Sequence, residues 1–497
     1  MNFLAKLDNR YVWHPFTQMR DWLRREPRVI VTGQGAVLRD MRGREYLDAN
    51  SSIWTNLHGH NHTRLNAAVV RQLRKIAHSS ALGLANEPAS RLAQELVKLV
   101  NQRSARPSDS RAPRGAARLT RNGGPALAKV FFSDDGSTAM EVALKLAYAF
   151  ARRTGRSKQP RFLSLQNAYH GDTVGAVSVG HIDLFHRQFC GLTFKSDQVM
   201  APYCYRCPYN RARPERQDAR EYRQCNWECL GVLEQKLRRA QRRDRPYAGF
   251  IFEPLMQGAA GMIAQPQGWL SQAAQLARAC GTLLIADEVM TGFGRTGFAV
   301  ANDTHSSTAP QLFACQKEGV QPDLMAVAKG LTGGYLPMAA TMTCQEIFDA
   351  FLGDYREFKS FFHGHSFTGN QLGAAAALAN LELLHKPACA RAAQRIEQTL
   401  WAELQQLWEH PCVGDIRQVG LVAGIELVKN WRTREPFDLR QQAGIRVCEA
   451  MARRGVLTRP IGNVVVLMPP YCSTVAQVRR MVQSLNDAIG QTGLDRG

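Results

Sequence analysis

Cysteine is scarce in this chain, and it has neither a long apolar run nor a leader-like start. Twelve cysteines in 497 residues are too few for a disulfide scaffold, so we expect reduced thiols. No window reaches the run of about 18 apolar residues that spans a bilayer. The first residues show no basic segment followed by an apolar one, which argues against a secretory signal. We therefore expect a cytoplasmic protein that does not enter a membrane.

Acidic residues are few relative to basic ones. The chain has 42 Asp and Glu against 63 Lys and Arg, a formal net charge of +21. Residues 101–125 and 206–245 together carry about half of this excess. Such charge favours contact with polyanions. However, the chain shows no nucleic-acid module, and no aromatic residues are interleaved with the arginines of 103–121, so specific nucleic-acid binding is not expected. Residues 101–125 are too polar to bury a core and are predicted to be a disordered surface loop.

What the sequence does contain is a repeated alternation of short apolar strands and helices. The predicted strands are 129–133, 161–165, 247–254, 282–289, 323–328 and 336–342. Between the first two, residues 137–153 place apolar side chains on one helical face. This order predicts an α/β fold with a mostly parallel sheet, in which ligands bind beyond the carboxyl ends of the strands. From about Ile347 the pattern is rich in helices and indicates a separate C-terminal domain.

Two of the strand ends carry residues suited to holding a flat, phosphorylated ligand. Gly136 and Ser137 follow a strand and begin a helix, where free backbone N–H groups can bind a phosphate. The plain alternative is an ordinary helix cap. Tyr169 follows the next strand and could stack on a planar ring, or simply pack within its loop.

Two further strand ends carry charged residues. Asp287 ends a strongly apolar strand, where a carboxylate needs a partner such as a cationic ring nitrogen, a metal ion or a helix cap. Lys329 ends another apolar strand, where burial lowers the pKa of a lysine and frees the amine for Schiff-base formation. Most such lysines instead reach toward solvent.

The order of these four features is more specific than any one of them. A phosphate turn, an aromatic residue, an acidic residue and a lysine on successive strands are the parts needed to hold pyridoxal phosphate. The carboxylate would keep the ring nitrogen protonated, and the lysine would hold the cofactor covalently. The pattern therefore predicts a pyridoxal-phosphate enzyme. A basic binding protein built on a decayed enzyme scaffold is the alternative from another class, and an intact Asp287 and Lys329 argue against it.

The block LIADEVMTGFGRTG at residues 284–297, followed by Lys329, resembles the signature of the class III pyridoxal-phosphate aminotransferases. The similarity runs nearly end to end. It implies a fold-type I transferase, with a large domain built on a seven-stranded, mostly parallel sheet and a smaller α+β domain formed from both ends of the chain. The domain limits we expect are 1–75, 76–345 with basic insertions at 101–128 and 204–245, and 346–497.

The resemblance also implies roles for individual residues. Lys329, Tyr169 and Asp287 would be catalytic, with Lys329 moving the proton between substrate and cofactor. Residues expected to bind the cofactor are Gly136, Ser137, Tyr169, Asp287, Val289 and Lys329, with His365 and Ser366 contributed by a neighbouring subunit of a homodimer. Residues expected to bind the substrate are Trp54, Tyr169, Lys329, Gly364 and Arg459, the last pairing with a carboxylate.

Four segments are similar to the branch of this family that acts in biotin synthesis: WHPFT at 13–17, YHGDT at 169–173, HGHSF at 363–367 and TRPIGN at 458–463. This similarity implies amino transfer to 8-amino-7-oxononanoate. S-adenosylmethionine is the usual donor in that branch, but Phe16 and Ile53 stand where its best-known members have Tyr and Trp. This difference makes lysine a serious alternative donor. Another class III ω-aminotransferase is a further alternative, which Arg459 in its context argues against.

Four cysteines in the second basic insertion could close a tetrahedral zinc site. They are Cys204, Cys207, Cys225 and Cys229. The second pair is separated by three residues rather than two, and no strand pairing is legible there. Reduced thiols are therefore the expected state, with zinc as the alternative.

Overall fold

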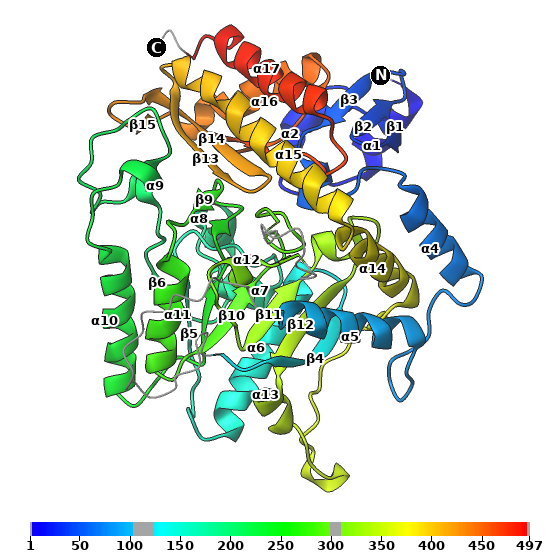
Figure 1. Ribbon diagram of the computed structural model, residues 1–497, viewed down its shortest axis with the longest axis vertical. Coiled ribbons are helices and arrows are strands. Elements are labelled where there is room, and N and C mark those ends of the chain that lie inside the picture. The colour runs from blue at the N-terminus through cyan, green and yellow to red at the C-terminus, as the bar shows by residue number, and fades with distance from the viewer. Residues whose placement is uncertain (1, 103–123, 299–309, 495–497) are drawn as a thin grey trace.

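The computed structural model describes residues 2–102, 124–298 and 310–494. Its central sheet has seven strands in the order β4-β12-β11-β10-β7-β5-β6 (Figure 1). The bounds are β4 Leu127–Ser133, β12 Ala339–Cys344, β11 Leu324–Val327, β10 Leu283–Asp287, β7 Gly249–Phe252, β5 Phe162–Leu165 and β6 Asp197–Val199. β12 runs antiparallel to both of its neighbours, whereas β11, β10, β7, β5 and β6 pair in parallel. The predicted mostly parallel seven-stranded sheet is thus confirmed.

Alternation along the strands divides the core into two layers. Ile251 and Ile285 pack with α6 (Gly136–Arg153), whereas Phe250 and Leu284, one residue earlier in each strand, pack in the cluster that includes α5 (Glu87–Val100) and α11 (Trp269–Ala279). A strand that is buried on both faces needs apolar residues at every position, which explains the continuous apolar runs in the sequence. The helix predicted for 137–153 is α6.

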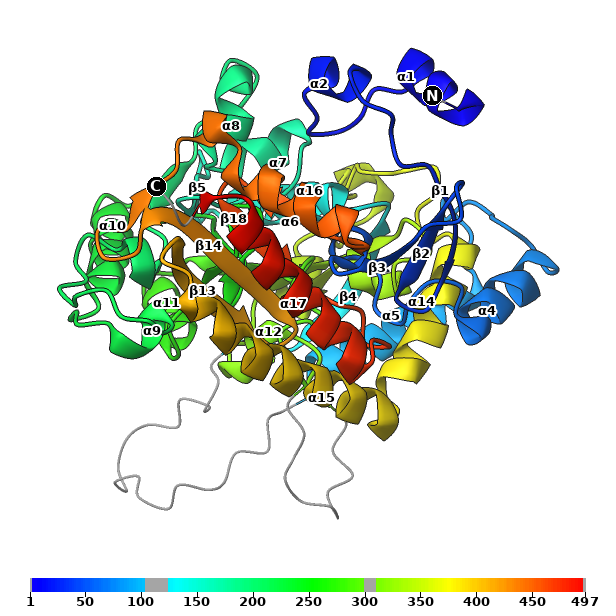
Figure 2. The same ribbon diagram turned by 90° about the horizontal axis from the view of Figure 1, so that it is seen from above.

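Both ends of the chain build the smaller domain. β3 (Glu45–Asp48) pairs in parallel with β16 (Val456–Leu457), with Leu47 opposite Val456. β1 (Ile30–Gln34) and β2 (Val37–Asp40) complete that sheet. A second sheet joins β13 (Val413–Val419), β14 (Val422–Asn430), β18 (Val464–Leu467) and β17 (Pro460–Ile461), and β15 (Glu435–Pro436) pairs with β14. Viewed from above, α16 (Ala443–Arg453) and α17 (Val475–Gln491) lie over these strands (Figure 2).

The remaining long helices connect and cover the two parts. α4 (Thr63–Leu73) and α5 pack against α14 (Gln371–Leu384), and α15 (Pro387–Leu404) packs against α17. α1 (Phe3–Tyr11) and α2 (Met19–Leu23) stand apart from the body (Figure 2). Because α14 contacts helices of the N-terminal half, the limit predicted at residue 346 does not mark a gap in packing. The exact domain limits stay a prediction.

The basic insertion at 204–245 is tied into the fold. Its second half is α10 (Glu228–Arg242), which packs against α11. Its first half lies against the β13–β14 hairpin, where Arg206 donates to Glu426 at 2.7 and 2.9 Å. Arg216 donates to the carbonyl oxygens of Val413 and His410, at 2.6 Å each. Several arginines of this basic insertion therefore bind partners inside the fold. The other Arg-rich stretch, 101–125, lies almost wholly outside the described residues.

A buried guanidinium links the smaller domain to the large one. Arg417 on β13 is 2% exposed and donates to Asp415 at 2.8 Å and to Glu426 at 2.7 Å. Its Nε also donates to the carbonyl oxygen of Met262 at 2.6 Å. Planar, delocalised guanidinium groups suit such sites because several donors are satisfied at once.

In the described parts of the chain, no helix is both long and apolar enough to cross a membrane. The cytoplasmic location stays a prediction.

R417M should strongly destabilise the protein, because it leaves Asp415 and Glu426 buried without their shared cation. Breaking a buried pair in this way costs about 3–5 kcal/mol. R238M is the matched control, since Arg238 forms an exposed pair with Glu234 at 2.6 Å, and solvent screening leaves such a pair little effect on stability. Urea unfolding of both variants measures the difference. Equal effects of the two substitutions would contradict the role assigned to Arg417.

Candidate active site

A cavity of about 700 Å³ opens at the carboxyl ends of the parallel strands. Four residues at the ends of those strands or in the loops after them line it. Lys329 follows β11, Asp287 ends β10, Glu253 follows β7 and Tyr169 follows β5. Trp54 reaches the same cavity from the N-terminal part of the chain. The structure therefore brings together the aromatic residue, carboxylate and lysine that the sequence pattern selected.

Two groups hold the carboxylate of Asp287 in place. Its Oδ2 lies 2.7 Å from Nδ1 of His170, and its Oδ1 accepts from the backbone N–H of Val289 at 3.0 Å. We assign the proton of this pair to His170 Nδ1, because an ionised carboxylate can only accept. Asp287 is 5% exposed, and a buried carboxylate persists only when it is paired in this way.

Lys329 is an amine without a polar partner. No hydrogen bond or ion pair joins its Nζ to any described residue, and Nζ lies 5.4 Å from the ring centroid of Trp54. Burial lowers the pKa of Lys329, although the negative charges of Asp287 and Glu253 oppose that shift. Its backbone has a φ of 43°, which is strained for a residue with a side chain. A neutral lysine amine placed in this way is a nucleophile suited to carbonyl carbons.

Gly136 and Gly171 form a cradle at the N-terminus of α6 that has no room for a side chain at either position. A Cβ on Gly136 would come within 2.7 Å of Val289 Cγ1, and a Cβ on Gly171, whose φ is 118°, would collide with Ser137. Ser137 Oγ accepts from the backbone N–H of Thr173 at 3.0 Å. Exposed N–H groups at the start of an 18-residue helix favour an anion.

Tyr169 is fixed at both ends. Its phenol donates to Asp172 Oδ2 at 2.7 Å, and its backbone N–H donates to Glu253 Oε1 at 3.2 Å. Burial, reinforced by Asp172, raises the pKa of Tyr169, so the phenol stays protonated. The ring of Phe16 meets the Tyr169 ring edge-on at 6.5 Å. Phe16, one of the two positions that bear on the choice of amino donor, therefore lies beside the site.

Trp54 is positioned by a short left-handed turn. Residues 51–54 all have positive φ, and Ile53 reaches 86°. Asp48 holds the turn by accepting from the backbone N–H of Ser52 at 3.1 Å, and Asn50 Oδ1 accepts from Trp54 Nε1 at 3.0 Å. Left-handed residues cost about 1–2 kcal/mol each, so these anchors are needed. Ile53 is 44% exposed and does not line the cavity.

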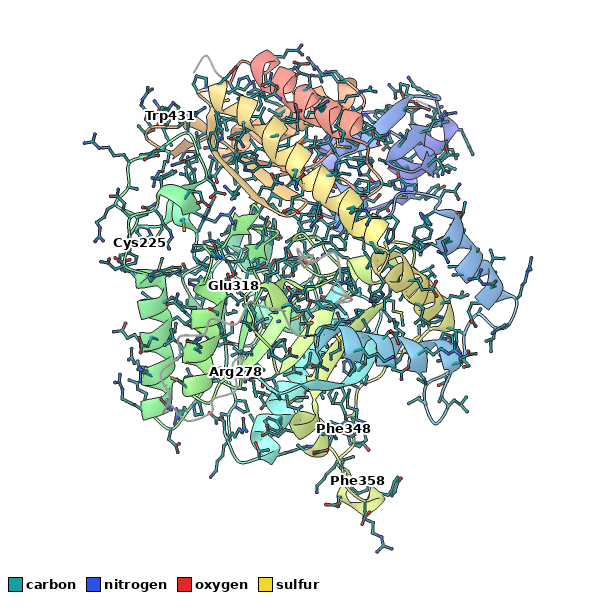
Figure 3. The ribbon with its side chains drawn as sticks, in the orientation of Figure 1. Cys225, Arg278, Glu318, Phe348, Phe358 and Trp431 are labelled. Carbon is teal, nitrogen blue, oxygen red and sulfur yellow. The ribbon has the colours of Figure 1, made fainter. Side chains whose placement is uncertain are left out.

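Four predicted site residues lie outside this cavity. Gly364, His365 and Ser366 belong to the segment 351–369, and none of them lines it. That segment projects from the body near Phe358, which is 64% exposed (Figure 3). Arg459, between β16 and β17, is exposed and has no hydrogen bond or ion pair with a described residue. A single chain therefore does not assemble these four residues with the other predicted site residues.

The four cysteines of the insertion lie within electrostatic range of one another. Among the described residues, no group of three or more His, Cys, Asp or Glu could hold a metal ion. Burial raises the pKa of Cys204 to about 12 and that of Cys229 to about 11, so both thiols stay protonated. Arg223 Nη1 donates to Cys225 Sγ at 3.2 Å, and Cys225 lies near the top of α10 (Figure 3). Reduced thiols stay the expected state of the four cysteines, with zinc as the alternative.

Sequence reasoning missed two residues at the site. Glu253 lines the cavity and is 6% exposed, and His170 pairs with Asp287. A signal for Glu253 was present, because it follows the apolar run of β7 just as Asp287 ends that of β10. His170 stands next to the selected Tyr169, but nothing local links it to a residue 117 positions away.

Comparison with known proteins agrees with this arrangement. The model of the family described as aminotransferase class-III matches residues 20–489. An adenosylmethionine-8-amino-7-oxononanoate aminotransferase from Geobacter sulfurreducens is 44% identical over 98% of this chain and 97% of its own length.

Solved structures extend the likeness to the fold. The crystal structure of an adenosylmethionine-8-amino-7-oxononanoate aminotransferase from Methanocaldococcus jannaschii has a TM-score of 0.84 and 37% identity, covering 98% of each chain. An ω-transaminase from Pseudomonas jessenii in complex with PMP has a TM-score of 0.84 and 27% identity, covering 99% of this chain and 98% of that one. The expected fold-type I arrangement and pyridoxal-phosphate dependence are thereby confirmed at the level of the family. The chain belongs to the class III aminotransferases.

Proposed function

We propose that this enzyme converts 8-amino-7-oxononanoate to 7,8-diaminononanoate in biotin synthesis, with S-adenosylmethionine as the amino donor. Relatives carrying the corresponding name match nearly the whole chain at 38–44% identity. The observation that carries the chemical part of the proposal is the unpartnered amine of Lys329 beside the buried Asp287. The ω-transaminases, at 27% identity, are more distant in sequence, which supports the biotin branch over a general ω-amine substrate.

The residues that line the cavity fit pyridoxal phosphate. The glycine cradle at the start of α6 suits its phosphate, Asp287 suits a protonated ring nitrogen, and Lys329 suits its aldehyde. Val289 and Tyr169 lie at the cavity wall, where they can cover the two faces of a ring. When bound, this cofactor supplies a carbonyl carbon that carries the amino group and a ring that takes up electrons.

Each polar side chain then has a defined task. Asp287 keeps a negative charge opposite the ring nitrogen because His170 and the Val289 amide stabilise its anion. Lys329, whose lowered pKa leaves more of its amine neutral, binds the cofactor and moves the proton of the transfer step at Nζ. Tyr169 and Trp54 exclude water from the two sides of the Lys329 amine.

G136A should weaken cofactor binding by about 10- to 100-fold, because its Cβ would overlap Val289 and displace the phosphate cradle. The double variant G136A/V289A should recover part of the loss by making room. G231A, on α10 where a Cβ meets nothing within 4 Å, is the control and should bind normally. Titration of apoenzyme with pyridoxal phosphate, followed by absorbance, measures all three. Wild-type affinity in G136A would contradict the cradle.

We further propose that the enzyme is a homodimer with shared sites, in which Gly364, His365 and Ser366 of one subunit complete the cavity of the other. The support is geometric, since these residues do not line the cavity of their own chain. Their segment also exposes large apolar side chains, with Tyr355 at 89% and Phe362 at 72%. Apolar surface of this extent on a projecting arm is typical of a buried contact with another chain.

Mixing two inactive variants tests the shared site. In a dimer of one K329A subunit and one H365A/S366A subunit, sharing leaves one site with all its residues intact. Random reassortment should therefore restore about a quarter of wild-type activity. If each chain instead supplied its own His365 and Ser366, no intact site would form and the mixture would stay inactive.

In this proposal, recognition of the substrate depends on Arg459, and the choice of amino donor depends on Phe16 and Ile53. Arg459 is free to bind a carboxylate with its guanidinium fork. Phe16 lacks the phenol hydroxyl that a tyrosine would offer beside Tyr169, and Ile53 replaces a large aromatic residue. These two positions favour lysine as the alternative donor in place of S-adenosylmethionine.

Single-turnover reactions separate the two donors. The loaded enzyme is mixed with S-adenosylmethionine or with lysine, and the loss of the visible absorbance of pyridoxal phosphate is followed. Although Phe16 and Ile53 keep lysine as the alternative, we expect S-adenosylmethionine to react at least about tenfold faster, because relatives at 38–44% identity are named for that donor and a few pocket contacts give discrimination of this order. Faster reaction with lysine would assign lysine as the donor, and a colourless wild type would overturn the aminotransferase proposal itself.

A further inference from the structure

Glu253 is a buried carboxylate that belongs to the cavity and has no role in the function described so far. It directly follows β7, is 6% exposed, and uses both of its oxygens on backbone N–H groups. Oε1 accepts from Tyr169 at 3.2 Å, and Oε2 accepts from Gly258 at 2.7 Å. One carboxylate thus joins the loop after β5 to the turn after β8 (Met256–Gln257).

The titratable groups that surround Glu253 are those of the reaction site. His170 and Tyr169 come from the loop after β5, Asp287 from β10, and Lys329 from the turn after β11. The negative charge of Glu253 raises the pKa of Lys329, against the lowering effect of burial. Burial raises the pKa of Glu253 itself to about 7, so the carboxylate is charged in mildly basic solution.

The imidazole of His170 has one side-chain anchor, and its loop is held by Glu253. The imidazole is fully buried, and its Nδ1 pairs with Asp287, but its Nε2 has no hydrogen-bond partner among the described residues. The ring is therefore fixed by one side-chain bond and by the backbone of its loop. The amide of Tyr169, next to it in sequence, is the point at which Glu253 holds that loop.

We propose that Glu253 is a positioning residue, which holds the Tyr169–His170 loop against Asp287 and places a negative charge near the amine of Lys329. This inference rests on the proposed function, because it concerns the binding site of pyridoxal phosphate. Glu253 does not touch the reacting atoms in this scheme. It acts through the backbone of its neighbours and through its charge.

Glu288 provides a matched control one residue away from Asp287. It is also a fully buried carboxylate, and it accepts from the backbone N–H groups of Ala314 at 3.0 Å and Cys315 at 2.7 Å. Burial raises the pKa of Glu288 as it raises that of Glu253. However, Glu288 does not line the cavity. If Glu253 had only a structural role, substitutions of Glu253 and Glu288 would have the same effect on the bound cofactor.

The experiment is a pH titration of the visible absorbance of loaded wild type, E253Q, E253D and E288Q. The lysine-bound cofactor loses its proton as pH rises, and a nearby negative charge raises the pH at which this happens. Removing that charge in E253Q should lower the midpoint by about one pH unit. E253D, which keeps the charge, should shift by less than half as much, and E288Q should match wild type. E253Q should also lower kcat about tenfold with little change in KM.

The outcomes distinguish the positioning role of Glu253 from the proposed function of the enzyme. A midpoint in E253Q equal to that of wild type, or an equal shift in E288Q, would overturn the positioning role while leaving the proposed function intact. Failure of E253Q to fold, with E253D and E288Q folded, would show that Glu253 is structural and would also overturn it. A wild type that takes up no cofactor would instead remove the proposed function.

Discussion

The structure of this site depends on keeping one carboxylate charged in the interior. Asp287 ends the strand at the middle of the large sheet, where water is excluded and an isolated anion would cost several kcal/mol. His170 and the amide of Val289 meet that cost, and each arrives on a different loop. Two loops are consequently constrained, because the one after β5 must present His170 and the one after β10 must present the Val289 amide.

Cations play two different parts in a chain with a formal charge of +21. Arg417 and Arg206 converge on Glu426 and hold the β13–β14 hairpin against segments of the large domain. These arginines are internal cross-links, so part of the basic excess balances buried carboxylates rather than attracting an external polyanion. Lys329 is the opposite case, since its amine has no hydrogen-bond or ion-pair partner among the described residues and is left free for chemistry.

Local patterns predicted the sheet and the strand ends well because each depends on a few consecutive residues. The six predicted strands were found, whereas β6 was missed because three residues, two of them polar, carry no apolar run. Glu253 and His170 were given no role because their contacts join positions 84 and 117 residues apart. Gly364, His365 and Ser366 could be named from resemblance but not located, since one chain does not bring them to the cavity.

Part of the backbone strain of the chain lies where the cavity is built. Lys329 and the turn at residues 51–54, including the β-branched Ile53, all have positive φ. Each such residue costs about 1–3 kcal/mol and persists only where the surroundings leave no alternative.

Asp48 supplies that constraint for the turn by binding Ser52 and, at 2.9 Å, His60. Its hydrogen bonds outweigh burial and lower the pKa of Asp48, so this anchor holds above the ordinary aspartate pKa and is lost only as pH falls through the lower folded value. The position of Trp54 is therefore maintained by hydrogen bonds of Asp48 and Asn50. The wall of the cavity and the stability of the smaller domain depend on the same contacts.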